Sequence, residues 1–442
     1  IIDKYPEMAY TEKHSFLPFD PTHPKAEEMM RKYITVVLSR FRGNPHYKAI
    51  HSLMLVNEPT YPAFSLANPV SVAHFQRYMK EKYGSVAEFN RLAQRKYADF
   101  KSVMAAARKD SAAGYEFYSC SRKVLADWLE RMGKLARSVW PGLPIHTKVM
   151  IFRSPFQRED GIDFERIGAF SDYNGNDNYF MPGKGKYLSS WEMEMMTNEL
   201  QISLNHKSVA NMEGHLFPDR TQAAIQNDHI YTATFERFIS GVSTLTSWVY
   251  HDAPWEATRK PNSHRAWYEG LYHRPGNLVA HARAVLDGMR LAPEIRCFFS
   301  YRPEVALLYA DSTVLTGKGM LHRNALRDFY AKSCFTGYRL GFCSERQVQR
   351  RDLGKIKILF VTGAPNVSKA CRDGLKAFVA SGGKIYVDSV SLTRDEYGNT
   401  LAPDFPVESL PAHLTLQAIA KLLVDHLPQL PIKVSPVDGI FY

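Results

Sequence analysis

The sequence is poor in cysteine and lacks any spacing typical of a metal site. Its 442 residues include only five cysteines, at positions 120, 297, 334, 343 and 371, and none of them forms a CxxC pair. An odd number of widely spaced cysteines argues against a disulfide framework and against a structural zinc site. We therefore expect free, buried thiols, no metal and no cofactor.

Long hydrophobic runs are also missing. No apolar stretch reaches the ~20 residues that a membrane span requires, so we expect no membrane partner. The chain begins with Ile1 and shows no signal peptide, which indicates a truncated or processed start. Unpaired thiols favour a cytoplasmic location, with the periplasm as the alternative.

Acidic residues are fewer than basic ones, and the formal net charge is +11. A basic surplus is one feature of nucleic-acid-binding proteins. Here, however, the basic residues are scattered, and the densest patch, between Arg346 and Lys357, is interrupted by Asp352. We therefore expect no nucleic-acid partner. Aromatic residues make up 12% of the chain, which suits either a sugar-binding cleft or a large core.

Apolar runs alternate with helical patterns along most of the chain. Five runs end near residues 58, 148, 179, 213 and 250, and the residues between them include helical patterns at 25–41, 115–139, 188–204 and 221–239. Such alternation predicts parallel βα units, although it does not by itself distinguish a barrel from an open sheet. In the helix at 25–41, Met29, Tyr33, Val36, Val37 and Phe41 are predicted to form the apolar face. In the helix at 188–204, we expect Glu192, Glu194 and Glu199 to face solvent.

The pattern changes after residue 291. Apolar strands at 305–309, 356–361 and 382–387 alternate with helical stretches at about 321–333 and 367–380. This predicts a small doubly wound α/β domain. The loop after Tyr309 has no glycine cradle, and Gly317-Lys318-Gly319 does not match a phosphate-binding loop. We expect this domain to be a scaffold without a ligand.

Two carboxylates lie at the ends of predicted strands. The apolar run from Leu53 to Val56 ends in Asn57-Glu58-Pro59, and Pro59 cannot continue a strand. Glu213 ends a second apolar run that begins at Val209. Carboxyl ends of parallel strands are where α/β barrels carry their chemistry, so both residues are candidates for catalysis.

The Asn57-Glu58-Pro59 motif followed much later by a strand-end Glu213 resembles the glycoside hydrolases of clan A. Two helical patterns follow Glu58, one from Ser71 to the Lys82-Tyr83-Gly84 stop and one that begins at the capping box Ser85-Val86-Ala87-Glu88, and this pair resembles the family 42 β-galactosidases. This resemblance implies an α/β fold: a (β/α)8 TIM barrel over residues 1–295, which lacks its first strands in this chain. It also implies a flavodoxin-like trimerisation-type domain over residues 300–395, a linker and the start of a C-terminal β region over residues 396–442, and a homotrimer.

The same resemblance implies roles for individual residues. Glu58 would be the acid/base and Glu213 the nucleophile of a retaining mechanism, with Asn57 on the sugar 2-hydroxyl, Tyr179 on the nucleophile and Trp248 on the sugar face. His251 and His146 are further candidates for sugar contacts. Each side chain apart from the two glutamates could equally have a purely structural role.

The implied substrate is a terminal β-galactoside in an oligosaccharide or another β-glycoside. β-Mannosides, β-glucosides and α-L-arabinosides remain alternatives, because neighbouring families use the same two-carboxylate machinery. A non-catalytic carbohydrate-binding or assembly subunit is the alternative from another functional class, and the incomplete barrel is the reason to consider it.

Overall fold

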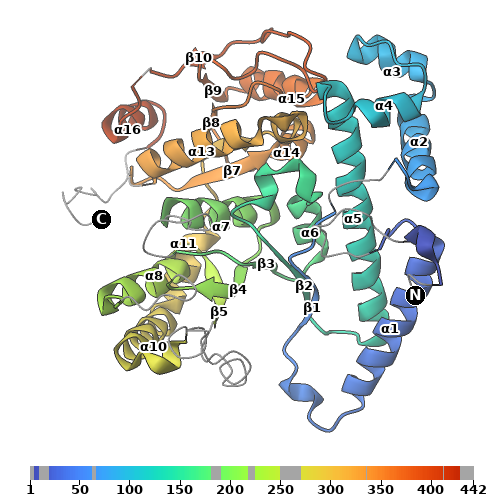
Figure 1. The fold of residues 1–442 in the computed structure, drawn as a ribbon. Coiled ribbons are helices and arrows are strands. Elements are labelled where there is room, and N and C mark those ends of the chain that lie inside the picture. The colour runs from blue at the N-terminus through green and yellow to red at the C-terminus, as the bar shows by residue number, and fades with distance from the viewer. Residues whose placement is uncertain are drawn as a thin grey trace.

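The computed structural model describes residues 4–8, 19–61, 66–180, 191–217, 224–248, 270–334, 336–411 and 413–428. Within them, two five-stranded parallel sheets are surrounded by helices (Figure 1). The chain is therefore of the α/β class, as the alternating pattern predicts.

The first sheet follows the order of the sequence. Its strands are β1 (Leu53–Asn57), β2 (Ile145–Val149), β3 (Asn174–Asn176), β4 (Val209–His215) and β5 (Val242–Trp248), and neighbours in this order are paired. All four pairings are parallel, so all five carboxyl ends lie at the same edge. The five predicted strands are thus confirmed.

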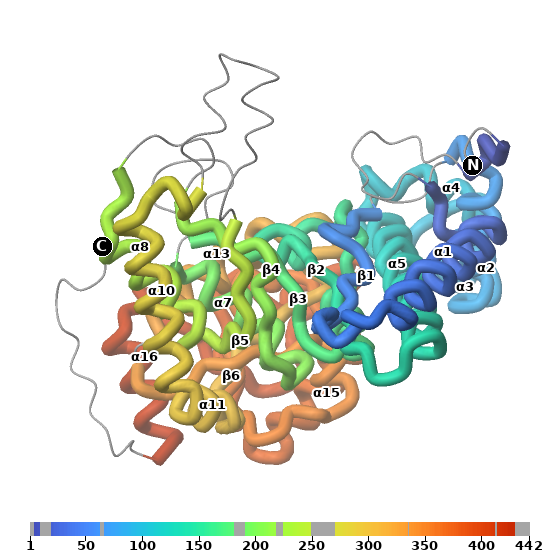
Figure 2. The backbone as a smooth tube through the Cα atoms, turned by 90° about the horizontal axis from the view of Figure 1, so that it is seen from below, coloured from blue at the N-terminus to red at the C-terminus, as the bar shows by residue number. Residues whose placement is uncertain are grey.

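Helices of very different length precede and separate these strands. Figure 2 shows α1 to α5 gathered at one end of the molecule and α8 and α10 at the other. The helices are α1 (Pro24–Arg42), α2 (Pro69–Tyr83), α3 (Val86–Ala93), α4 (Phe100–Ala106), α5 (Ser111–Val139), α6 (Phe164–Phe170), α7 (Trp191–Asn205), α8 (Asn227–Ile239), α10 (Pro275–Arg290) and α11 (Ala292–Ser300).

The predicted apolar face of α1 is wrong. The helix packs against α5 through Ala26, Met30, Ile34 and Leu38, whereas Tyr33, Val36 and Phe41 are exposed. Both sets of residues have helical spacing, and only the position of α5 decides which set is buried.

The second sheet consists of β6 (Val305–Tyr309), β7 (Leu340–Ser344), β8 (Ile358–Val361), β9 (Lys384–Val387) and β10 (Glu408–Ser409). The strands are ordered β10-β9-β8-β6-β7. Counted from β6, this is the 2-1-3-4-5 order typical of flavodoxin-like folds. Its helices are α12 (Asp311–Thr313), α13 (Gly319–Ser333), α14 (Glu345–Gln349), α15 (Lys369–Ala380) and α16 (Leu416–Val424).

Five of these elements were not predicted: β7, β10, α16 and the short helices α12 and α14. β7 has the sequence LGFCS, whose glycine and serine weaken the strand pattern. β10 pairs with β9, and α16 packs against α13. The described part of the expected C-terminal linker therefore adds a strand and a helix to the second sheet.

Helix α7 lies between the two sheets and packs against β7. The expectation that its glutamates face solvent is wrong for two of them. Glu194 is paired with Arg237 of α8 at 2.7 Å, and Glu199 with Arg339 at 3.0 Å, and all four side chains are buried. A buried carboxylate requires such a partner, and both partners come from distant parts of the chain.

All five cysteines are free. Cys120, Cys343 and Cys371 are buried as expected, whereas Cys297 is exposed. Among the described helices, none is long and apolar enough to cross a membrane.

Candidate active site

Glu58 and Glu213 both lie at the carboxyl edge of the first sheet. Glu58 directly follows β1, and its backbone N–H donates to the carbonyl of Lys148 on β2 at 2.9 Å. Its φ of +46° is uncommon for a residue other than glycine, and such backbone strain is concentrated at functional sites. Glu213 lies on β4 where the pairing with β5 becomes irregular, and bulges of this kind redirect side chains.

The ammonium group of Lys148 joins the two carboxylates. Its Nζ donates to Glu58 Oε1 at 3.0 Å and also contacts Glu213 Oε2. Lys148 is 2% exposed, whereas the side chains of Glu58 and Glu213 are 15% and 19% exposed. Since one nitrogen contacts both groups, the facing carboxylate oxygens lie within about 6 Å of each other, twice the length of a hydrogen bond.

A third carboxyl group, that of Asp177, faces the same ammonium. Asp177 follows β3, is fully buried, and places Oδ2 3.9 Å from Lys148 Nζ. The Tyr179 hydroxyl lies 3.4 Å from both Asp177 Oδ2 and Glu213 Oε1. The structure therefore brings together Glu58, Glu213 and Tyr179, as predicted.

Burial and neighbouring charges separate the pKa values of these groups. Burial opposes ionisation of Glu213, but hydrogen bonds from His215 and Lys148 outweigh it and lower the pKa. Burial raises the pKa of Asp177 well above its usual range, and a hydrogen bond with the Glu58 carboxyl raises it further. Burial and the nearby carboxylates likewise raise the pKa of Tyr179. The surroundings thus shift the pKa values of Glu213 and Asp177 in opposite directions.

His215 connects the carboxylates to Trp248. Its Nε2 lies 3.4 Å from Glu213 Oε1, and its ring meets the Tyr179 ring edge-on with the centroids 4.4 Å apart. On the other side it stacks on Trp248, the last residue of β5, at 6.1 Å. Trp248 is 48% exposed, so an apolar ring is available to solvent beside the cluster.

The remaining predicted residues have different positions. Asn57 precedes Glu58 and is exposed. His146 is 1% exposed and stacks on Tyr173 with the ring centroids 4.7 Å apart, and burial lowers its pKa to about 4. It is a neutral residue of the sheet interior rather than a member of the carboxylate cluster. His251 lies outside the described residues.

Lys148, Asp177 and His215 are not among the site residues predicted from the sequence. The signal that could have identified Lys148 is a charged residue inside an apolar strand, because such a residue must find a partner of opposite charge. No local pattern identifies that partner.

A buried ion pair supports the strand that carries Glu213. Arg237 and Glu194 are both fully buried, and Arg237 Nη2 donates to the carbonyl of His215 at 2.7 Å. Gly214 is required here, because a Cβ at this position would lie 2.8 Å from Arg237 Nη1. In the structure the guanidinium group of Arg237 occupies the space beside Gly214.

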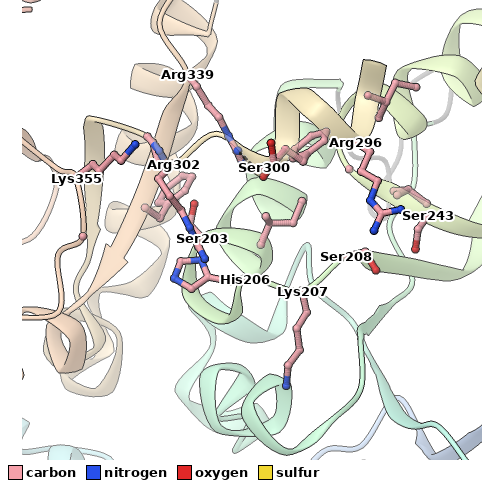
Figure 3. A pocket seen from close by; sticks show the side chains of 18 of the residues that line it. Ser203, His206, Lys207, Ser208, Ser243, Arg296, Ser300, Arg302, Arg339 and Lys355 are labelled. Carbon is pink, nitrogen blue, oxygen red and sulfur yellow. Dashed lines mark hydrogen bonds between the residues drawn. The ribbon is translucent and has the colours of Figure 1, made fainter. Parts of the chain in front are cut away.

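A cavity of about 1180 Å³ lies at the opposite end of the strands (Figure 3). It is lined by residues that precede β4, including His206, Lys207 and Ser208, and by parts of α11 and the second sheet. Lys207 precedes Glu213 by six residues, which is roughly 20 Å along an extended strand. The cavity is therefore separate from the carboxylate cluster.

Several solved structures have a similar fold. The structure of an apo exo-carrageenase GH42 from Bacteroides ovatus has a TM-score of 0.79 at 20% identity, covering 96% of this chain and 61% of that one. A β-galactosidase from Bacillus circulans sp. alkalophilus has a TM-score of 0.68 at 14% identity, covering 90% and 60%. A catalytic mutant of Gan42B, a GH42 β-galactosidase from G. stearothermophilus, has a TM-score of 0.67 at 15% identity, covering 90% and 61%.

The chain has the glycoside hydrolase family 42 fold. The predicted fold class is therefore confirmed, with the first sheet forming part of a TIM barrel. The chain spans about three fifths of the length of these family 42 structures. At the level of sequence, neither a family model nor a curated protein matches it.

Proposed function

We propose that this protein is a retaining glycoside hydrolase that removes terminal β-galactosyl residues, with Glu58 as the acid/base and Glu213 as the nucleophile. The observation that carries the proposal is the contact of both carboxylates with one ammonium nitrogen. Retaining glycosidases hold their two carboxyl groups about 5–5.5 Å apart, whereas inverting enzymes need about 6.5–9.5 Å to admit a water molecule. A spacing within about 6 Å supports the retaining mechanism.

The reaction proceeds in two displacements. Glu213 attacks the anomeric carbon while Glu58 gives its proton to the departing glycosidic oxygen, which leaves a glycosyl ester on Glu213. Glu58 then takes a proton from a water molecule, the water oxygen bonds to the anomeric carbon, and the ester bond to Glu213 breaks. The low pKa of Glu213 suits its role as the attacking anion.

Neighbouring side chains have supporting roles in this proposal. The Tyr179 hydroxyl, 3.4 Å from Glu213, donates to the nucleophile. Trp248 offers a ring face to the sugar, Asn57 contacts the 2-hydroxyl, and His251 remains a candidate for a hydroxyl contact. His146 is buried under Tyr173 and is no longer proposed as a sugar contact.

The sugar is proposed from the fold, because two of the structural neighbours described above are β-galactosidases. A second candidate is an exo-enzyme for sulfated galactans. The neighbour with a TM-score of 0.79 is an exo-carrageenase, and carrageenans are sulfated galactans.

A panel of nitrophenyl glycosides tests the proposal. We expect turnover of the β-galactoside by the wild type and none by E213Q. The β-mannoside, β-glucoside and α-L-arabinoside test the alternative sugars, and desulfated and sulfated galacto-oligosaccharides separate the two galactan candidates. Calorimetric binding of a sugar without turnover of any substrate would instead identify a non-catalytic carbohydrate-binding protein.

The homotrimer also remains a proposal. It rests on the flavodoxin-like strand order of the second sheet and on the family resemblance. Sedimentation equilibrium measures it directly: a mass of three chains supports the trimer, and a monomer mass contradicts it.

A further inference from the structure

The residue between the two candidate catalytic carboxylates has a role that the proposed function does not yet assign. We propose that Lys148 is a positioning residue whose single ammonium group balances the negative charge on Glu213 in the free enzyme and on Glu58 in the glycosyl-enzyme. This inference rests on the proposed function, because both glutamates must alternate in charge for it to apply.

The position of Lys148 is central. Its strand, β2, lies between β1, which leads into Glu58, and β3, which leads into Asp177. Its Nζ faces three carboxyl groups: Glu58 at 3.0 Å, Asp177 at 3.9 Å, and Glu213. A lysine that is 2% exposed requires a partner of opposite charge, and here the candidates are carboxyl groups that follow β1 and β3 or lie on β4.

Lys207, two residues before β4, shows what a structural lysine next to the same sheet looks like. Its Nζ donates to three backbone carbonyls, those of Gly168, Ala169 and Ser171, at 2.8, 2.9 and 2.6 Å. In Figure 3 it points away from the other labelled side chains. Lys207 donates to the backbone carbonyls at the C-terminal end of α6, whereas Lys148 faces ionisable carboxyl groups.

The groups around Lys148 explain why one ammonium group is sufficient to balance the negative charge of the carboxyl cluster. Glu58, Asp177 and Glu213 face it, together with the Tyr179 hydroxyl and the His215 ring beside Glu213. Burial raises the pKa of the Asp177 carboxyl well above its usual range, and the Glu58 carboxyl beside it raises that pKa further. Lys148 can therefore pair with Glu213 while Glu58 and Asp177 together hold the proton that the first displacement needs.

The same contacts serve the second half of the reaction. When Glu58 gives up its proton and Glu213 becomes a neutral ester, the negative charge moves from Glu213 to Glu58. Because Lys148 Nζ already contacts both groups, it compensates the charge in either state without leaving its place. Charge stabilisation by a group that is already in position requires little reorganisation during the reaction.

The first test compares K148M with the wild type by the pH profile of nitrophenyl galactoside hydrolysis. Without the cation the pKa of Glu213 rises, so the acidic limb of kcat/KM should move up by at least one pH unit, and kcat should fall much more than KM changes. An unshifted acidic limb would overturn the proposal. K207M is the matched control and should keep the wild-type profile.

The second test needs no substrate and so remains informative if the enzyme hydrolyses no glycoside. The loss of Tm in K148M should be larger at pH 8 than at pH 5, because protons can neutralise the carboxylates in acid. The loss in K207M should be the same at both values. An equal loss at both pH values in K148M would show a merely structural lysine.

A double variant covers the case in which K148M alone is too unstable to purify. E213Q/K148M removes one negative charge together with the positive one and should be more stable than K148M at pH 8. A double variant as unstable as K148M would contradict charge balance by Lys148, whatever the fate of the glycosidase proposal.

Discussion

The two sheets each have a glutamate immediately after a parallel strand, and the two glutamates have different surroundings. Glu58 follows β1 and is 15% exposed, beside Lys148 and two further carboxyl groups. Glu345 follows β7 and is 3% exposed. Both positions satisfy the simple rule that carboxyl ends of parallel strands carry functional residues.

The carboxylate of Glu345 is fully engaged by neutral donors. It accepts from the backbone N–H groups of Ser312 and Ser368 at 2.7 and 3.1 Å, and from their hydroxyls at 2.9 and 2.7 Å. Thr313 and Asn366 bond to each other across the adjacent β6–β8 position, where flavodoxin-like folds bind ligands. This edge is filled by the protein's own side chains.

The comparison separates a reactive edge from a structural one. At the first sheet, carboxyl groups share one cation and keep some solvent exposure, so their protonation states can change. At the second sheet, Glu345 is held by four neutral donors, and the Arg122–Asp311 pair at 2.6 Å joins this edge to α5. A glutamate at the end of a strand therefore indicates a functional site only when its interaction partners are also known.

The largest predicted difference between the edges is catalytic. Glu58→Gln should lower kcat/KM by about 10²–10⁴-fold, because a general acid/base contributes that much. Glu345→Gln, the matched change at the other edge, should leave kcat/KM unchanged. Steady-state kinetics of the two variants measure the contrast, and equal losses in both would remove the distinction between the edges.

The next largest effect is expected for the buried Arg237–Glu194 ion pair beside the first edge. Arg237→Met should destabilise the fold by about 3–5 kcal/mol, because it leaves Glu194 buried without its partner. Chemical denaturation gives the free energy of unfolding. R290M, at an exposed pair on α10, is the control and should change it by less than about 1 kcal/mol. If R237M loses no more unfolding free energy than R290M, the Arg237–Glu194 pair does not stabilise the first edge.

The structural edge should show its own pH dependence. Burial raises the pKa of Glu345 to about 7, above its unfolded value, so the unfolded chain ionises first and stability falls as the pH rises from about 4.5 to 7. Relative to E345Q, the wild type should therefore lose about 3 kcal/mol across this range. Unfolding free energies at pH 5 and 8 test this, and parallel curves for both proteins would contradict it.

The smallest effect is expected at the rim of the first edge. Trp248→Ala should raise KM by about tenfold or less, since an exposed aromatic contact contributes about 0.5–1.5 kcal/mol. The unfolding free energy should change little, because Trp248 is half exposed. Michaelis–Menten kinetics with unchanged KM would remove Trp248 from the substrate-binding surface.

The sequence alone determined the alternation of strands and helices, and it identified Glu58, Glu213, Tyr179 and Trp248 as candidates. These follow from local properties: apolar runs define strands, Pro59 ends one of them, and a parallel sheet aligns all carboxyl ends at one edge. The face of α1, the burial of Glu194 and Glu199, and the convergence of three carboxyl groups on Lys148 were decided only by the tertiary structure. Each depends on a partner from a distant segment, and charge pairing across strands leaves no periodic signal in the sequence.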